Sequence, residues 1–192
     1  MRPLFAMLAL ALSMPAFATT YEVDGAHSQI GFSVTHMMVS TVRGTFGTVS
    51  GTIEWDPKNV AATKVSGKVD ITSVDTNNAD RDTHLKAPDF FDVAQFPEMT
   101  LVSKSVKNIK ATGFDLVTDL TLHGITKEVV FHVNTLSGEF KDPWGNIKAG
   151  TTATAKINRQ DFGVSWNKGL DQGGYVVGDE VSIELDLELL KK

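Results

Sequence analysis

Apolar and polar side chains alternate along most of the chain, and this period of two is typical of β-strands that bury one face. The alternation is most regular in residues 113–122 and 179–190, where apolar side chains recur at every second position. Glycines and short polar stretches separate the alternating segments and indicate turns. The pattern predicts about eight antiparallel strands. The alternating segments are residues 29–36, two short segments that glycines punctuate and that end near Trp55, and residues 64–74, 100–106, 113–122, 127–136, 149–158 and 179–190.

The regular segments carry apolar side chains on one face, which we expect to point inward. In residues 113–122 this face holds Phe114, Leu116, Leu120 and Leu122, and a short turn at His123–Gly124 returns the chain as a hairpin. In the final segment the opposite face carries acids, which we expect in water. Residues 149–158 are rich in threonine and alanine, and these small side chains are predicted to leave space inside the sheet.

The strand pattern predicts an all-β fold without internal repeats or linkers. One antiparallel sheet can bury its apolar face by closing on itself or by packing as a two-sheet sandwich. The many glycines favour a strongly bent sheet, and we therefore predict a lipocalin-like antiparallel barrel with a short helical insertion. A barrel of eight strands has room either for its own side chains or for one small ligand.

Residues 77–97 interrupt the alternation and hold several charges, one histidine and three phenylalanines. Asn77 is predicted to cap a short helix that Pro88 ends, and a second turn then holds Phe90 and Phe91. Scaffolds rich in strands usually carry function on such insertions. We therefore expect this segment to form part of the functional site.

The first 18 residues have the features of a removable signal peptide. Arg2 supplies a positive charge, residues 4–12 form an apolar stretch too short to span a bilayer, and Ala16–Ala18 resembles a cleavage site. We predict cleavage after Ala18, export to the periplasm, and one domain over residues 19–192.

Composition narrows the partners. The formal net charge of −5 disfavours binding to nucleic acid and to anionic surfaces. The chain has no cysteine, so it has neither a disulfide framework nor a thiol for lipid attachment, and no run after residue 18 is suited to a membrane helix. We expect no nucleic-acid partner and no stable membrane insertion. The sequence leaves the oligomeric state open, a homodimer included.

Catalytic and metal-binding motifs are sparse. The chain has no Gly-x-Ser-x-Gly elbow, and its five histidines form no His-Glu-x-x-His pair. We therefore predict no catalytic residue, no metal and no cofactor. A Ser-His-Asp set can still assemble from distant positions, which keeps a periplasmic hydrolase as an alternative. A ligand-free stress or interaction module, with a filled barrel, is the other.

Several motifs follow one another in an order that closely resembles the YceI-like family of exported lipid-binding proteins. The resemblance spans almost the whole chain after residue 20. The motifs are Tyr21-x-x-Asp24-x-x-His27-Ser28, Gly44-x-Phe46, Arg81-Asp82-x-His84-Leu85, Phe90-Phe91-Asp92 with Phe96-Pro97, Leu120-Thr121-Leu122-His123-Gly124-Ile125-Thr126, and Arg159-x-Asp161-Phe162-Gly163.

The resemblance implies an extended lipocalin-like barrel whose lumen holds a polyisoprenoid or a related long-chain, fatty-acid-like amphiphile. We expect ligand contacts from apolar strand faces, from the insertion, from the Met37–Met38 break and from the irregular segment after residue 158. The candidate ligand-binding residues are Phe32, Met37, Met38, Arg81, His84, Phe90, Phe91, Phe96, Phe114, Leu116, Leu120, Leu122, Phe131, Phe162 and Trp166.

The arginines allow two interpretations. Arg43, Arg81 and Arg159 are predicted in or beside turns, an arrangement compatible with one cationic rim. Arginine grips a phosphate or carboxylate head group through paired hydrogen bonds, and histidine, here His84, donates or accepts as pH changes. The alternative is structural: Arg81 pairs with Asp82, Asp92 or another acid to pin the insertion, and Arg159 does the same with Asp161.

Overall fold

One antiparallel sheet of twelve strands runs through residues 18–192, the part of the chain that the computed structural model describes. The predicted signal peptide lies outside these residues except for Ala18. The strands are β1 (Thr19–Val23), β2 (Gln29–His36), β3 (Ser40–Phe46), β4 (Val49–Trp55), β5 (Lys64–Asp70), β6 (Val74–Asp75), β7 (Glu98–Lys110), β8 (Gly113–Leu122), β9 (Ile125–Asn134), β10 (Phe140–Lys141), β11 (Ile147–Asn158) and β12 (Val177–Lys191).

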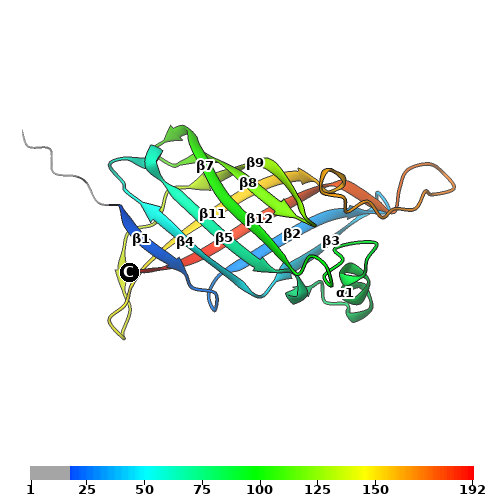
Figure 1. Cartoon of the computed structure of the whole chain (residues 1–192), viewed down its shortest axis with the longest axis horizontal. Helices are drawn as coiled ribbons and strands as arrows, with labels where there is room; N and C mark the ends of the chain where they lie inside the picture. Colours follow the sequence, from blue (N-terminus) through cyan, green and yellow to red (C-terminus); the bar gives the residue numbers. More distant parts are fainter. Residues whose placement is uncertain (1–17) are drawn as a thin grey trace, which may run out of the picture.

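Pairing between β11 and β12 closes the sheet into a barrel, as predicted (Figure 1). The ring of eight strands runs in the order β11, β9, β8, β7, β5, β4, β1 and β12. Strand β12 has fifteen residues and is long enough to pair with three other strands, which allows it to close the barrel. It pairs with β11 along one edge, and on the other edge with β1 near Lys191 and with β2 over Val177–Asp186.

Regular alternation predicted the strands well. The bounds of β2 and β8 agree with the sequence pattern, and β8 pairs with β9 from Gly113↔Asn134 to Leu122↔Ile125 as the expected hairpin. Two expectations were wrong. Residues 21–28 were expected as a lead-in without a strand, but Thr19–Val23 forms β1 because β12 and β4 both pair with it. The strand expected over residues 64–74 ends at Asp70, where the carboxylate accepts a hydrogen bond from Thr72 N and starts a short turn.

The insertion is helical as predicted. Asn78, rather than Asn77, caps the helix, because its side chain accepts the Arg81 N–H at 2.9 Å while Asn77 has a φ of 59° outside the helix. Among the described residues, no helix combines the length and apolar content needed to cross a bilayer. The helices are α1 (Ala79–Lys86), η1 (Val60–Ala62), η2 (Ile71–Ser73) and η3 (Arg159–Phe162).

One end of the barrel is packed with its own side chains. Trp55 and Phe114 stack with ring centroids 5.7 Å apart, and Leu189, which pairs with Val23 and Ala149, is completely buried in the apolar core. The alanines of β11 are buried in this cluster too. None of them borders the cavity described below, which only Ile157 of this segment reaches, so the alanines do not leave the space that was expected of residues 149–158.

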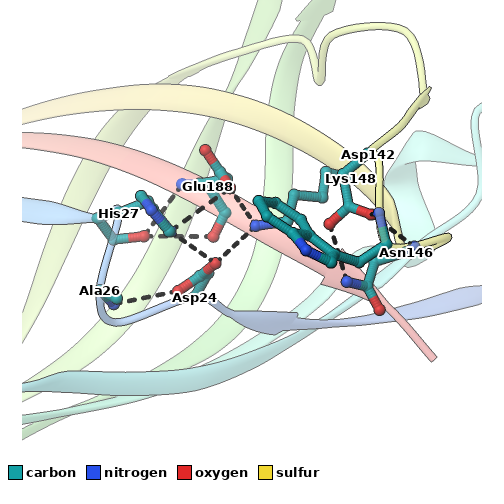
Figure 2. A network of polar contacts seen from close by, with 9 residues as sticks. Asp24, Ala26, His27, Asp142, Asn146, Lys148 and Glu188 are labelled. Atoms are coloured by element: carbon teal, nitrogen blue, oxygen red, sulfur yellow. Dashed lines mark hydrogen bonds and ion pairs between the residues drawn. The ribbon is translucent and has the colours of Figure 1, made fainter.

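A charged clasp holds this packed end together (Figure 2). The Lys148 ammonium lies 2.8 Å from the Asp24 carboxylate and 2.5 Å from that of Glu188, and His27 bonds to Asp24 at 2.9 Å. Lys148 and His27 hold the pKa of Asp24 well below its usual range. Nearby, Tyr21 donates a hydrogen bond to Glu139, and burial raises the pKa of Tyr21 to about 12.

Replacement Asp24→Asn should lower the free energy of unfolding at neutral pH, because Lys148 loses one of its two carboxylate partners. The pKa of Asp24 is depressed in the folded protein, so its stabilisation is full above about pH 4 and is lost as pH falls through the folded-state pKa. Urea unfolding at several pH values should show the difference from wild type narrowing below about pH 4.

The matched control is Asp186→Asn, which removes the same charge from an exposed position on β12. It should follow the wild-type pH dependence. An Asp24→Asn variant that loses stability on acidification in parallel with wild type would contradict the prediction.

Candidate functional site

The other end of the barrel is hollow. A cavity of about 520 Å³ lies between the strands and the insertion, and its walls are almost entirely apolar. This volume falls within the range of about 300–1,000 Å³ that is usual for ligand pockets. The wall side chains that were not among the candidate ligand-binding residues are mainly aliphatic: Val34, Val42, Val65, Met99, Leu101, Ile157, Val181, Ile183, Leu185 and Leu187.

The last strand shows where the interior changes from solid to hollow. The inward side chain of Leu189 has an exposed fraction of 0%, whereas Ile183, Leu185 and Leu187 on the same face are only half-buried and line the cavity. Lining residues on β12 run from Val177 to Leu187, which is about 30 Å of strand at about 3.3 Å per residue. The cavity is therefore elongated along the barrel.

The insertion covers the cavity at its polar end. Asp80, Arg81, His84 and Leu85 of α1 all line it, as does Phe90 in the turn that follows. Figure 1 shows α1 beside the end of the barrel opposite to the C-terminus, which is the hollow end. The expectation that the insertion helps to form the candidate site therefore agrees with the geometry.

Three rings join the insertion to the irregular segment before β12. His84 meets Phe90 and Trp166 edge-on, with centroids 4.9 and 5.3 Å away, and Phe90 lies 5.2 Å from Trp166. The Nε2 atom of His84 is hydrogen-bonded to the Asp89 carboxylate at 2.8 Å. These contacts place a titratable ring between the cavity and solvent.

Arg81 pins the insertion, but its partner is not an acid. Its Nε and one terminal nitrogen donate to the hydroxyl and the carbonyl of Thr76, both at 2.7 Å, and Asp82 accepts from the same residue. The structural interpretation had expected an ion pair between Arg81 and Asp82 or Asp92, but within residues 18–192 neither pair forms and the guanidinium bonds to Thr76 instead. The guanidinium nevertheless borders the cavity.

Arg159 is a buried anchor rather than part of a cationic rim. It is 4% exposed and donates to the carbonyls of Val164, Trp166 and Gly178, and it pairs with Asp179 instead of Asp161. Burial lowers the pKa of this guanidinium, while Asp179 acts in the opposite direction. Arg43 lies inside β3, not beside a turn. The predicted rim of three arginines is therefore wrong.

Nine of the fifteen candidate residues border the cavity. Two of them, Leu120 and Leu122, come from β8, and Phe131 comes from the paired strand β9. Their contact with a ligand stays a prediction. The full set is Phe32, Arg81, His84, Phe90, Phe91, Leu120, Leu122, Phe131 and Trp166.

The other six candidates lie elsewhere. Phe114 and Leu116 belong to the packed end. Phe162 is 2% exposed and lines a separate pocket of about 660 Å³ formed by residues of β9, β11, η3 and β12. Phe96 packs on His123 with centroids 4.7 Å apart and tethers the end of the insertion to the β8–β9 turn. The remaining two, Met37 and Met38, are exposed in the turn between β2 and β3.

The described residues offer little for metal or covalent chemistry. One group, Asp24, His27 and Glu188, brings three possible ligand atoms within 4.8 Å, but Lys148 already supplies a cation to both of its carboxylates. Within residues 18–192, no serine or threonine hydroxyl hydrogen-bonds to a histidine ring, the contact that a Ser-His-Asp set requires.

Comparison with known proteins agrees with this architecture. The family model described as the YceI-like domain matches residues 21–189. A UPF0312 protein of Pseudomonas putida is 37% identical over 186 residues, covering 94% of this chain and 95% of that protein.

Two solved structures share the fold. The Campylobacter jejuni YceI protein is 30% identical with a TM-score of 0.67 and covers 88% of this chain and 96% of its own. A polyisoprenoid binding domain from Saccharophagus degradans is 18% identical with a TM-score of 0.61, over 92% of this chain and 99% of that domain. The matched family domain, the close relative and the shared barrel together establish that this chain belongs to the YceI-like family.

Proposed function

We propose that the protein binds and carries a long-chain amphiphilic lipid, a polyisoprenoid or a fatty-acid-like molecule, with its hydrocarbon tail in the barrel cavity. The observation that carries this proposal is the elongated apolar cavity of about 520 Å³. Burial of each methylene group is worth about 0.8 kcal/mol, so a long tail gains affinity without polar contacts. An elongated cavity suits an extended chain better than a compact ring system.

The mouth supplies the polar chemistry for a head group. Arg81 and His84 border the cavity near its exposed end, together with Asp80 and Lys68. Cations so placed favour a head group that accepts hydrogen bonds, such as a phosphate, a carboxylate or a carbonyl. In this proposal Phe90, Phe91 and Trp166 cover the first part of the tail.

Two further facts support the proposal. The Saccharophagus degradans domain that shares this fold is described as polyisoprenoid binding. The first 18 residues resemble a signal peptide, which would bring the protein to the periplasm, where a water-insoluble lipid needs a carrier between membranes. Export and periplasmic location are thus part of the same hypothesis.

The alternatives have less support. A ligand-free module would gain stability by filling its interior, yet half of this barrel is hollow and apolar. A hydrolase needs an activated nucleophile, and the histidines of the described histidine–acid pairs, His27–Asp24, His84–Asp89 and His132–Asp115, have no hydroxyl partner.

Native extraction tests the proposal directly. Protein purified from the periplasm without detergent and extracted with organic solvent should release one recurring long-chain lipid in near-stoichiometric amount, identified by mass spectrometry. The matched control is Leu185→Trp purified in parallel, which should release less. Protein that repeatedly yields no lipid, and that takes none up when supplied, would overturn the proposal.

Leu185→Trp should weaken binding of a dansyl-labelled fatty acid by at least about tenfold. The indole fills cavity space, and excluding two methylene groups from burial costs about 1.6 kcal/mol. Its control is Asp186→Trp, the next residue along β12, which is exposed on the opposite face. Fluorescence titration should give wild-type affinity for that control. Equal affinity for Leu185→Trp and wild type would remove β12 from the binding wall.

A further inference from the structure

Large apolar side chains gather at the tip of the molecule beyond the hollow end of the barrel. The exposed fractions are 44% for Met37, 68% for Met38, 86% for Val39 and 61% for Tyr175. We call these four residues the apolar tip. Exposed apolar groups that cluster in this way mark surfaces that contact another apolar phase.

Two of these side chains lie in the turn between β2 and β3, at positions where the backbone conformation is unfavourable for methionine. Met37 and Met38 have φ values of 49° and 60°, and Val39 N donates to His36 O to close the turn. Such turns favour asparagine and glycine, because a side chain with a positive φ is strained. Methionine here weakens the turn, so a role outside folding explains its presence better.

The apolar tip is one continuous surface. Met37 N donates to Val176 O at 2.7 Å, which joins the β2–β3 turn to the segment that carries Tyr175. The sulfur of Met38 lies over Gly174, where an added Cβ would be only 2.3 Å away from it. The two segments therefore present their apolar side chains together.

The tip also adjoins the cavity. His36 precedes the strained turn and lines the cavity, and so do Val176 and Val177, which follow Tyr175. Only one or two residues of chain thus separate the apolar tip from the cavity wall. A molecule that leaves an apolar phase at the tip would therefore be close to the cavity. This continuity distinguishes the tip from Phe140 and Trp144, which are exposed on the β10–β11 hairpin beside the packed end.

Local charge favours a lipid surface despite the net charge of the chain. Residues 35–43 and 165–178 contain Arg43 and Lys168 but only one acid, Asp171, whereas the whole chain has a formal net charge of −5. Lysine, arginine and tyrosine place apolar stems or rings toward hydrocarbon while their polar ends stay in the interface.

We propose that the apolar tip docks on a lipid bilayer and inserts Met37, Met38 and Val39 among the outer acyl chains, which brings the cavity mouth to the membrane. The purpose of docking, though not docking itself, rests on the proposed function, because the carried lipid would enter and leave the cavity at this end. Docking itself is reversible, because a few side chains bury far less apolar surface than a membrane-spanning segment.

The test is flotation of the purified protein with vesicles of phosphatidylcholine containing a minority of phosphatidylglycerol. The double variant Met38→Asn/Val39→Ser should bind vesicles at least about tenfold more weakly, because it loses two inserted apolar side chains. Asparagine suits a positive φ, so urea unfolding should find this variant at least as stable as wild type. Trp144→Ser, at the opposite end, is the matched control and should float like wild type.

Docking would be overturned by no flotation of wild type, by equal flotation of the double variant, or by loss of flotation in Trp144→Ser instead. Dimerisation that the double variant abolishes, without vesicle binding, would assign the tip to a second copy of the chain and also overturn it. Uptake of a dansyl-labelled fatty acid from ethanol, without vesicles, tests the proposed function separately. The double variant should take it up normally, and failure of wild type there leaves the flotation result standing.

Discussion

Closure of the hydrogen-bonded ring is the constraint on which the rest of this structure depends. Buried backbone N–H and C=O groups need partners, and a closed barrel supplies them through its strands without exposed sheet edges. Because the β11–β12 pairing completes that ring, the wall does not need a filled interior at every level. The hollow half is therefore compatible with a stable fold, provided that the other half packs well.

The two ends of the barrel accordingly use different chemistry. At the packed end, aromatic stacking fills the interior and the Lys148 clasp ties the β1–β2 connection to β11 and β12. At the hollow end the cavity occupies part of the interior, and arginine side chains hold the covering segments. Arg159 binds several backbone carbonyls of the segment before β12, and Arg81 binds Thr76. Hydrogen bonds to backbone groups fix these segments without filling the cavity.

Most of the barrel wall was predictable because a strand with one buried face alternates apolar and polar residues in its sequence. The faces of β8 and β12 followed from alternation alone, and so did the hairpin of β8 and β9. The position of the cavity was not predictable. Leu116 and Leu120 are identical residues on the same face of one strand, and both are buried in the core, yet only Leu120 also lines the cavity. The difference lies in what other strands place opposite them, which no local pattern contains.

Contacts between residues far apart in the chain could not be predicted for the same reason. Thr19–Val23 is too short to alternate convincingly and becomes a strand only because β4 and β12 flank it. Arg159 looked like a partner for Asp161, two residues away, whereas its contacts come from carbonyls and an acid of the segment that folds back over it. Arg81 and Arg159, both in family motifs, border the cavity and also hold the segments that cover it. The sequence could not distinguish a ligand-contacting role from this structural role.

The structure does separate the two arginines that border the cavity. A guanidinium has five N–H donors. Arg159 spends its donors on Val164, Trp166, Val177, Gly178 and Asp179 and is almost completely buried. Arg81 makes two side-chain hydrogen bonds within the described residues, both to Thr76, and is only partly buried.

An incoming head group would have to break several bonds to engage Arg159, but it can meet the remaining donors of Arg81 without disturbing the fold. The cavity wall itself is almost entirely apolar, so in the proposed complex it would discriminate among tails by length and shape and leave the head group to these few donors. Recognition of the head group in the proposed complex therefore falls to Arg81 with His84, while Arg159 keeps the covering segment in place.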